Sequence, residues 1–170
     1  MVKVYRTHSL APQFIPEEYL PPGENQYYLR NLQASAEEIP WRGLTDAEIA
    51  ALETGGNSAE DWSTVLVCDP FLPEFIRRSS FYGLVRIGRL DGAVLEFHDL
   101  RVQSGIENCR IIDCDIGHDV ALHNLSYCAH YRIGEASILR DIDELHVTNH
   151  AKFGNGILKE GEPEEDRVRL

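Results

Sequence analysis

Aliphatic-glycine pairs that recur through the second half of the chain constrain its fold more than any other feature. Three of them are Ile87-Gly88, Ile116-Gly117 and Ile133-Gly134. The last two open six-residue units in which two variable positions follow the glycine and a small or branched residue comes next. No apolar stripe of helical period runs across ten residues of this region, so the pattern does not favour helices.

The same six-residue frame fits three further stretches less closely, at residues 90–95, 106–111 and 112–117. The second and third aliphatic-glycine pairs lie 17 residues apart, which is one short of three units. The first and second pairs lie 29 residues apart, which is not a multiple of six. Local insertions therefore interrupt the repeat.

Six-residue units are typical of a left-handed parallel β-helix, in which three short strands make one triangular coil of about eighteen residues. The aliphatic residue of each unit points inward and stacks on its equivalent one coil away, while glycine allows the tight bend. We therefore predict a mostly β chain. Its parts are an extended arm over residues 1–42, a short α-helix and lead-in strand over 43–75, the β-helix over 76–158, and an acidic tail or truncated strand over 159–170. The alternative is an antiparallel sandwich with glycine-rich turns.

The predictions for the first seventy residues rest on breakers and caps. Most of the prolines precede residue 41, and aromatic residues among them indicate an arm that lies on a surface of this chain or of a partner. Thr45 and Glu48 have the spacing of a capping box, and Gly55-Gly56-Asn57 stops the helix that they begin. A short strand is expected at residues 65–67.

The composition of the chain disfavours several classes of binding partner. The chain has 16 basic and 28 acidic residues, a net charge of −12, which disfavours nucleic acid and a polybasic grip on a membrane. No apolar run approaches the roughly 20 residues of a membrane helix, and the first residues do not resemble a signal peptide. We therefore expect a cytoplasmic protein. The four cysteines lack C-x-x-C spacing and are expected to be small buried thiols.

Three stretches resemble the start of a family of large, uncharacterised bacterial proteins that carry a domain of unknown function. They are Leu44-Thr-Asp-Ala-Glu-Ile-Ala-Ala-Leu-Glu53 with Asn57-Ser-Ala-Glu-Asp-Trp-Ser63, then Phe75-Ile-Arg-Arg-Ser-Ser-Phe-Tyr-Gly-Leu-Val-Arg-Ile-Gly88, and Lys152-Phe-Gly-Asn-Gly156. The resemblance covers roughly residues 42–158 and implies that the chain corresponds to only the N-terminal part of such a protein.

That family is similar to the hexapeptide-repeat acyltransferases that act on sugar nucleotides. The similarity implies a left-handed β-helix, an acyl-CoA donor, a small-molecule acceptor, and a homo-oligomer or the remainder of a longer chain as partner. The family supplies no established catalytic residues, so none is carried over.

Histidines are the first candidates for chemistry. In hexapeptide acyltransferases a histidine deprotonates the acceptor as it attacks an acyl thioester, a role that suits an imidazole because its pKa lies near the working pH. His130 and His146 are the candidates by elimination, and His130 lies between Tyr127 and Tyr131. A structural histidine is the alternative at each position. A small anionic ligand would be bound by arginines, for which the candidates are Arg86, Arg110 and Arg132.

A second pattern favours a metal. His118 and His123 resemble the Gly-His-x4-His element of γ-class carbonic anhydrases, which are also left-handed β-helices. This resemblance implies zinc held by these two residues and a third histidine, His98 or His146, with a bound water of pKa near 7. The chain lacks the Arg-Gly-Asp element of that class, and Asn124 follows where Gly-Cys is expected. The alternative is a pair of surface or corner histidines.

Three functions therefore remain open. The first is an acyltransferase-like domain that acts on a nucleotide-sugar or a similar small molecule. The second is a non-catalytic β-helix that serves as a structural or oligomerisation module, and the third is zinc-dependent hydration. The fold-based ranking is an association between fold and function, which is a weak argument.

Overall fold

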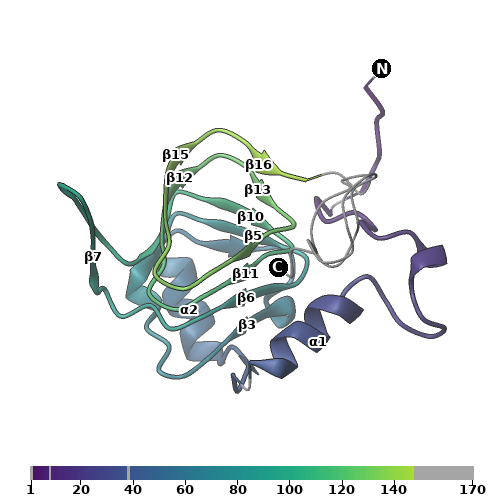
Figure 1. Ribbon diagram of the computed structural model, residues 1–170, viewed down its shortest axis with the longest axis horizontal. Helices are drawn as coiled ribbons and strands as arrows, with labels where there is room; N and C mark the ends of the chain where they lie inside the picture. The colour runs from purple at the N-terminus through teal and green to yellow at the C-terminus, as the bar shows by residue number, and fades with distance from the viewer. Residues whose placement is uncertain (1, 8, 38, 148–170) are drawn as a thin grey trace, which may run out of the picture.

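A coil of stacked parallel strands forms the centre of the computed structural model, which describes residues 2–7, 9–37 and 39–147 (Figure 1). The motif at 152–156 and the acidic tail over 159–170 lie outside the described residues. None of the described helices is long and apolar enough to cross a membrane.

Three sheets form the sides of the coil, and the chain visits them in rotation. Sheet 1 contains β2 (Ser58–Ala59), β5 (Ser80–Tyr82), β10 (Arg110–Ile112), β13 (Cys128–Ala129) and β16 (Leu145–His146). Sheet 2 contains β1 (Arg42–Gly43), β3 (Val65–Val67), β6 (Val85–Ile87), β11 (Asp115–Ile116) and β14 (Arg132–Ile133). Sheet 3 contains β4 (Ile76–Arg77), β9 (Gly105–Glu107), β12 (Ala121–Leu125) and β15 (Ile138–Ile142).

Neighbouring strands in these sheets are parallel, with one exception: β1 runs antiparallel to β3. The antiparallel sandwich is therefore wrong. The parallel pairing already includes β2 and β3, so stacked strands begin before residue 76, where the sequence pattern becomes visible.

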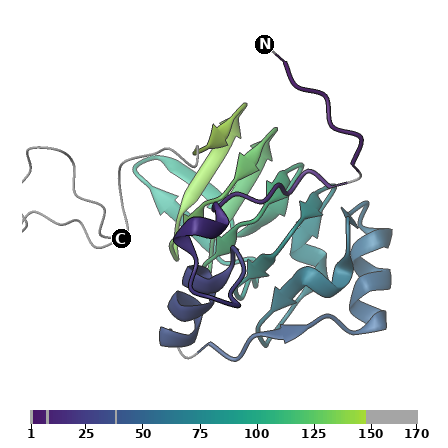
Figure 2. The same cartoon turned by 90° about the vertical axis from the view of Figure 1, so that its right-hand side faces the viewer.

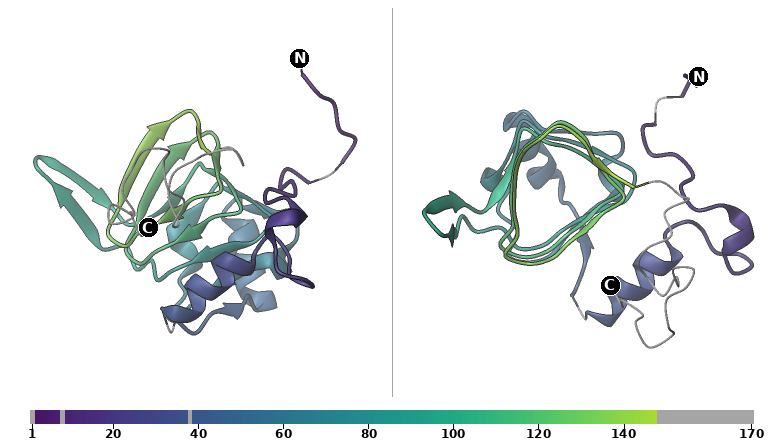
Figure 3. Two further views of the ribbon diagram at one scale, coloured as in Figure 1. Left: turned by 45° about the vertical axis from the view of Figure 1, so that its right-hand side comes forward. Right: turned by 45° about the horizontal axis from the view of Figure 1, so that its top comes forward.

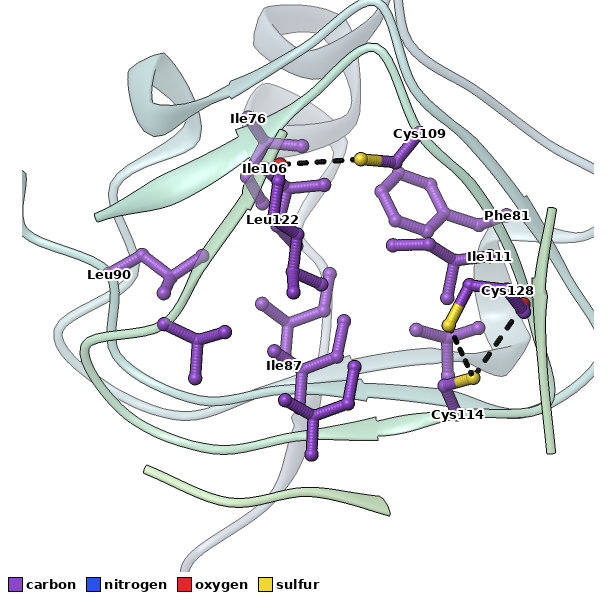
Figure 4. Close-up of a cluster of buried hydrophobic side chains, with 14 of the residues drawn as sticks. Ile76, Phe81, Ile87, Leu90, Ile106, Cys109, Ile111, Cys114, Leu122 and Cys128 are labelled. Atoms are coloured by element: carbon purple, nitrogen blue, oxygen red, sulfur yellow. Dashed lines mark hydrogen bonds between the residues drawn. The ribbon is translucent and has the colours of Figure 1, made fainter. Parts of the chain in front are cut away.

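Aliphatic side chains at matching positions form the core inside the coil (Figure 4). Ile87, Ile116 and Ile133 stand in register in sheet 2, so the three aliphatic-glycine pairs occupy one column. Ile106 and Leu122 stand in register in sheet 3, and each is fully buried. Each column removes apolar surface from water at about 25 cal/mol per Å², which is the main term that holds the coils together.

A hairpin explains the irregular repeat. Strands β7 (Val94–Phe97) and β8 (Leu100–Gln103) pair antiparallel and project from the coil between sheets 2 and 3 (Figure 1). This insertion separates Ile87 from Ile116 by more than one regular coil. The six-residue unit expected at residues 90–95 is wrong, because Leu90 is buried in the coil whereas Val94 lies in the hairpin and is 59% exposed.

The helix predicted after residue 45 is present as α2 (Asp46–Thr54) at the first-coil end of the stack (Figure 2). The Thr45 hydroxyl accepts a hydrogen bond from the Glu48 amide, and the Glu48 carboxylate accepts one from the Thr45 amide at 2.8 Å. The capping box is therefore confirmed. Two 3₁₀ turns, η2 (Trp62–Thr64) and η3 (Pro73–Phe75), connect the first strands.

The expectation of a single short α-helix is wrong, because the arm contains a second one. After a 3₁₀ turn η1 (Glu17–Tyr19), the chain forms α1 (Tyr28–Ala36) between Pro22 and Pro40. A helix this short is marginal by itself, so packing against sheet 2 stabilises it. Viewed along the coil, the arm and α1 lie on the side away from the hairpin (Figure 3, right).

The cysteines are free and buried, as expected. Burial raises the pKa of the Cys68 and Cys109 thiols. Cys114 and Cys128 approach each other inside the coil with their sulfurs 3.8 Å apart (Figure 4). All four thiols are therefore core residues in this structure.

Candidate functional site

The candidate site lies at the corner where sheet 1 turns into sheet 2. Three residues stack there from successive coils, each with left-handed backbone: Gly83 (φ 62°), Asp113 (φ 50°) and His130 (φ 62°). A Cβ atom at Gly83 would collide with the Asp113 carboxyl group, so glycine is required below the aspartate. The tight corner therefore brings Asp113 and His130 together, although 17 residues separate them.

The Asp113 carboxyl group anchors this corner and is almost completely buried, with 3% of its side chain exposed. Its Oδ1 accepts hydrogen bonds from the Tyr27 hydroxyl and the Leu84 amide, both at 2.9 Å. Its Oδ2 lies 3.8 Å from His130 Nδ1 and has no hydrogen-bond partner among the described residues. Burial raises the pKa of Asp113, and both burial and the nearby Asp113 charge raise that of Tyr27.

His130 is held between Asp113 and the arm. The Phe14 ring stacks on the imidazole with a centroid separation of 3.8 Å and an interplanar angle of 15°. Burial, followed by the positive charge of Arg30 and by His146, lowers the pKa of His130 to about 4. The Asp113 carboxyl group would favour the imidazolium, but its own raised pKa weakens that attraction. His130 is therefore neutral at pH 7.

Two cavities border this histidine. The first has a volume of about 220 Å³ and is lined by Phe14, Ile15, Gln26, Tyr27, Leu29, Arg30, Gln33, Asp113, His130, Tyr131 and Arg132. The second has a volume of about 330 Å³ and is lined by Pro12, Gln13, Phe14, Tyr127, Ala129, His130, His146 and Val147. We call them the arginine pocket and the histidine pocket. The predicted candidates His130 and His146 thus meet at the histidine pocket.

An ion-pair layer between α1 and sheet 2 positions the cations. Arg86, Asp115 and Arg132 stand in register on the outer side of the sheet. Arg30 of α1 binds Asp115 at 2.6 Å, and Arg86 binds the same carboxylate at 3.1 Å. Arg132 pairs with Glu37 beyond the end of the helix. The layer gathers three arginines on a chain that is acidic as a whole.

The three arginines predicted to bind an anionic ligand lie in different environments. Arg132 lines the arginine pocket, but Arg86 is only 5% exposed beneath α1. Arg110 is exposed on the outer side of sheet 1, in register with Ser80, and lines neither pocket. The structure therefore does not bring these three side chains into one pocket.

The proposed zinc ligands His118 and His123 lie on different segments. His118 Nδ1 accepts the Arg89 amide at 2.9 Å, near the Cys68 sulfur at 4.0 Å. His123 lies in β12 in register with Glu107, and no group of three or more potential metal ligands is found among the described residues. Their zinc role stays a prediction that metal analysis of the purified protein would check. The remaining candidate, His98, lies in the hairpin against the Phe97 ring.

Sequence reasoning identified His130 but not its neighbours Phe14, Tyr27, Arg30 and Asp113. One signal was available: Asp113 precedes His130 by the same 17 residues that separate Ile116 from Ile133. No comparable signal existed for the arm residues, because their position depends on how α1 packs.

A protein of Treponema pallidum (strain Nichols), described as an uncharacterized protein, is 44% identical to this chain over 169 residues. The match includes 99% of this chain but only 23% of the relative, so the chain spans about a quarter of that protein's length. No solved structure matches the chain. A family model described as "Domain of unknown function (DUF4954)" matches residues 41–165, and the chain therefore belongs to this family.

Proposed function

We propose that this chain is the acyltransferase-like coil of a longer protein and that His130 accepts a proton from a small-molecule acceptor. The observation that carries the proposal is the position of His130 Nδ1, 3.8 Å from the buried Asp113 carboxyl group at a pocket wall. A carboxyl group that accepts a hydrogen bond from a histidine orients the ring and stabilises the imidazolium that forms during proton transfer. The 3.8 Å contact is longer than a hydrogen bond, so the proposal requires it to shorten when an acceptor binds.

In the proposed reaction, an acceptor hydroxyl or amine gives its proton to His130 while its oxygen or nitrogen attacks the thioester carbonyl of acyl-CoA. The carbon–sulfur bond then breaks, and the departing thiolate takes the proton back from the imidazolium. The pKa of about 4 keeps the imidazole unprotonated at pH 7, but it also makes the ring a weaker base than an ordinary histidine. The role therefore requires that acceptor binding raise the pKa of His130. His146 borders the same cavity and is the second candidate for this role.

The fold that we propose for the coil is the left-handed parallel β-helix of the hexapeptide type. Three short strands per coil and the 17-residue step between Ile116 and Ile133 support it. An experimental structure at a resolution that fixes the hand of the coil is the test, and a right-handed coil would overturn the assignment.

The proposed acceptor is a nucleotide-sugar or a similar small anionic molecule. Arg132 lies at the wall of the arginine pocket, where a guanidinium suits a phosphate or carboxylate. Arg86 would act indirectly, through the carboxylate of Asp115 that also holds Arg30. Nothing in the position of Arg110 connects it to this acceptor.

The test of this function measures free thiol released from acetyl-CoA in the presence of UDP-N-acetylglucosamine. The expected result is thiol release by the wild-type protein and its loss in His130→Gln, with wild-type rates in the control Glu96→Gln, which changes an exposed hairpin residue that lines neither pocket. A melting temperature unchanged by either compound, together with no thiol release, would overturn the proposal, since a ligand at 100 times its Kd adds about 2.7 kcal/mol of stability.

A second candidate function is a non-catalytic structural module. Within the described residues, β14, β15 and β16 are the outermost strands of their sheets and are paired along one edge only. Further coils of a longer protein could pair with these edges, as repeat architectures do. If this function is correct, His130→Gln leaves the activity and assembly of the long relative intact, whereas deletion of the coil disrupts its assembly.

A further inference from the structure

The Phe14 side chain lies at the wall of both cavities of the candidate site. Phe14 and His130 are the two residues that line both the arginine pocket and the histidine pocket. Their rings are nearly parallel, 15° apart, at a centroid distance of 3.8 Å. Phe14 therefore occupies a slot on the face of the imidazole, at the centre of the candidate site.

The segment that carries Phe14 is attached to the coil more weakly than α1 is. In the described part of this segment, the Ser9 hydroxyl donates a hydrogen bond to the Glu60 carboxylate of the coil at 3.0 Å. The Phe14 amide instead donates to Gln26, which belongs to the arm itself. The helix that follows is held by ion pairs of Arg30 and by further bonds to buried groups. The slot can therefore open while α1 stays in place.

The chemistry around the slot combines a flat surface with cationic groups. Tyr27, Tyr131 and the neutral His130 ring surround the arginine pocket, where Arg30 and Arg132 also lie. One terminal nitrogen of Arg30, Nη1, is buried without a hydrogen-bond partner among the described residues, although it lies 3.9 Å from Oδ1 of Asp113, which also lines the pocket. A ring in the place of Phe14 that carried a negatively charged substituent would stack on the imidazole and face these guanidinium groups.

We propose that the slot filled by Phe14 is a binding site for a flat aromatic acid and that Phe14 is its internal competitor. The inference rests on the proposed function only in placing the acyl acceptor at this site. Of the small anionic molecules proposed there, it favours a hydroxyl- or amino-substituted aromatic carboxylate over a nucleotide-sugar. An attached side chain is present at a high effective concentration, so the free ligand binds only when the arm leaves.

The test is a calorimetric titration of 4-aminobenzoate into the wild-type chain, Phe14→Ala and the control Leu10→Ala. Leu10 is an exposed residue of the same arm and lines neither pocket. We expect about tenfold tighter binding by Phe14→Ala than by the wild type and wild-type affinity in Leu10→Ala. Adding Arg132→Gln to Phe14→Ala should weaken binding about tenfold, and the neutral probe 4-aminobenzamide should bind no better than this double variant.

Equal affinity of the wild type and Phe14→Ala, or no binding by either, would overturn the proposal. Equal affinity for the acid and the amide would overturn the assigned class of ligand. Phe14→Leu, which keeps an apolar side chain but removes the flat ring, replaces Phe14→Ala if that variant does not fold and should also bind more tightly than the wild type. Because these experiments measure binding, the acyl-transfer proposal and this inference can fail independently.

Discussion

Residues with left-handed backbone set the corners of this coil. Asn108, Asn124 and Asp141 occupy one corner in successive coils, with φ between 54° and 60°. The side-chain amide of Asn108 donates to Oδ1 of Asn124 at 3.1 Å, and the side-chain amide of Asn124 donates to Oδ1 of Asp141 at 2.8 Å. Asn and Asp tolerate this backbone better than other non-glycine residues, and here their side chains also connect the coils. His130 occupies the neighbouring corner, so its backbone position follows the same architecture.

The first residue-scale prediction concerns His130. Its pKa is about 4 in the folded chain and near 6.5 when unfolded, so the fold favours the neutral ring. The stability that this ring contributes is present above pH 6.5 and is lost as the pH falls towards 4, by up to about 3 kcal/mol. The groups facing the ring are Asp113, Arg30 and His146. The raised pKa of Asp113 acts in the opposite direction and offsets part of the loss.

The measurement is an NMR titration of the His130 ring together with urea unfolding between pH 4 and 7. We expect a midpoint near pH 4 in the wild type and a shift towards 6.5 in Phe14→Ala, because the stacked ring contributes to the burial. The pH dependence of stability should flatten in His130→Gln. A wild-type midpoint at 6.5 would show that the ring is solvated and the pocket open.

The second residue-scale prediction concerns Asn57, which is 5% exposed. Its side-chain NH₂ group donates to the backbone carbonyl oxygens of Leu52 and Ile76, both at 2.8 Å. Its side-chain oxygen accepts a hydrogen bond from the Ser79 backbone amide at 3.0 Å. Asn57→Ala removes these side-chain bonds from the Ile76 carbonyl and the Ser79 amide, whereas the Leu52 carbonyl keeps its bond from the Asn57 backbone amide at 3.0 Å. The variant should reduce the free energy of unfolding by about 3 kcal/mol, measured by urea denaturation. The exposed control Asn25→Ala should change it by less than about 1 kcal/mol.

At the scale of elements, the two helices differ in how much their local sequence specifies them. Helix α2 has a complete capping box, so its start is visible in the sequence. Helix α1 has no side-chain cap, and it is held on sheet 2 through Arg30, Asn31 and the neighbouring Tyr27. Because these partners are distant in sequence, periodicity could not reveal that the arm contains a helix.

The element-scale prediction tests the cap of α2. Thr45→Ala removes the oxygen that accepts from the Glu48 amide and should cost about 1 kcal/mol in urea unfolding. The matched control is Thr54→Ala at the other end of the helix, where the hydroxyl donates to the Ala50 carbonyl within the helix. We expect this control to cost less than about 0.5 kcal/mol. Equal losses in the two variants would contradict the capping role.

At the scale of the whole molecule, the stacking of coils gives residues at equivalent repeat positions different amounts of free space. Gly117 and Gly134 follow the same column of isoleucines in adjacent coils. A Cβ atom at Gly117 would lie 2.6 Å from the backbone nitrogen of Glu135, whereas one at Gly134 would meet no atom of the described residues within 4 Å. The difference comes from the coil above Gly117 and not from the glycines themselves.

The corresponding prediction compares Gly117→Ala with Gly134→Ala. The first variant must shift the backbone of the next coil and should lose about 1–3 kcal/mol of unfolding free energy. The second should change it by less than about 0.5 kcal/mol. Urea denaturation of both variants under one set of conditions provides the measurement, and equal losses would mean that the coils are not stacked as described.

The repeat determined most of the coil because each unit contacts its equivalent one coil away. The spacing of Ile116 and Ile133 therefore predicted one column, and the irregular step before Ile116 predicted an insertion. The site was less predictable. His130 was found as a histidine between tyrosines, but its pairing with Asp113 needed the corner, and the contacts of Phe14 and Arg30 needed the packing of the arm.

The sequence by itself determined the mostly β character, the start of α2 and the burial of the cysteines, because period, caps and composition act locally. Only the tertiary structure decided that the arm contains α1, that Arg86 is buried under it, and that Phe14 covers His130. These features arise from contacts between residues more than fifty positions apart, such as Arg30 with Asp115. Such contacts leave no periodic signal, since they form between two different surfaces rather than between copies of one repeat.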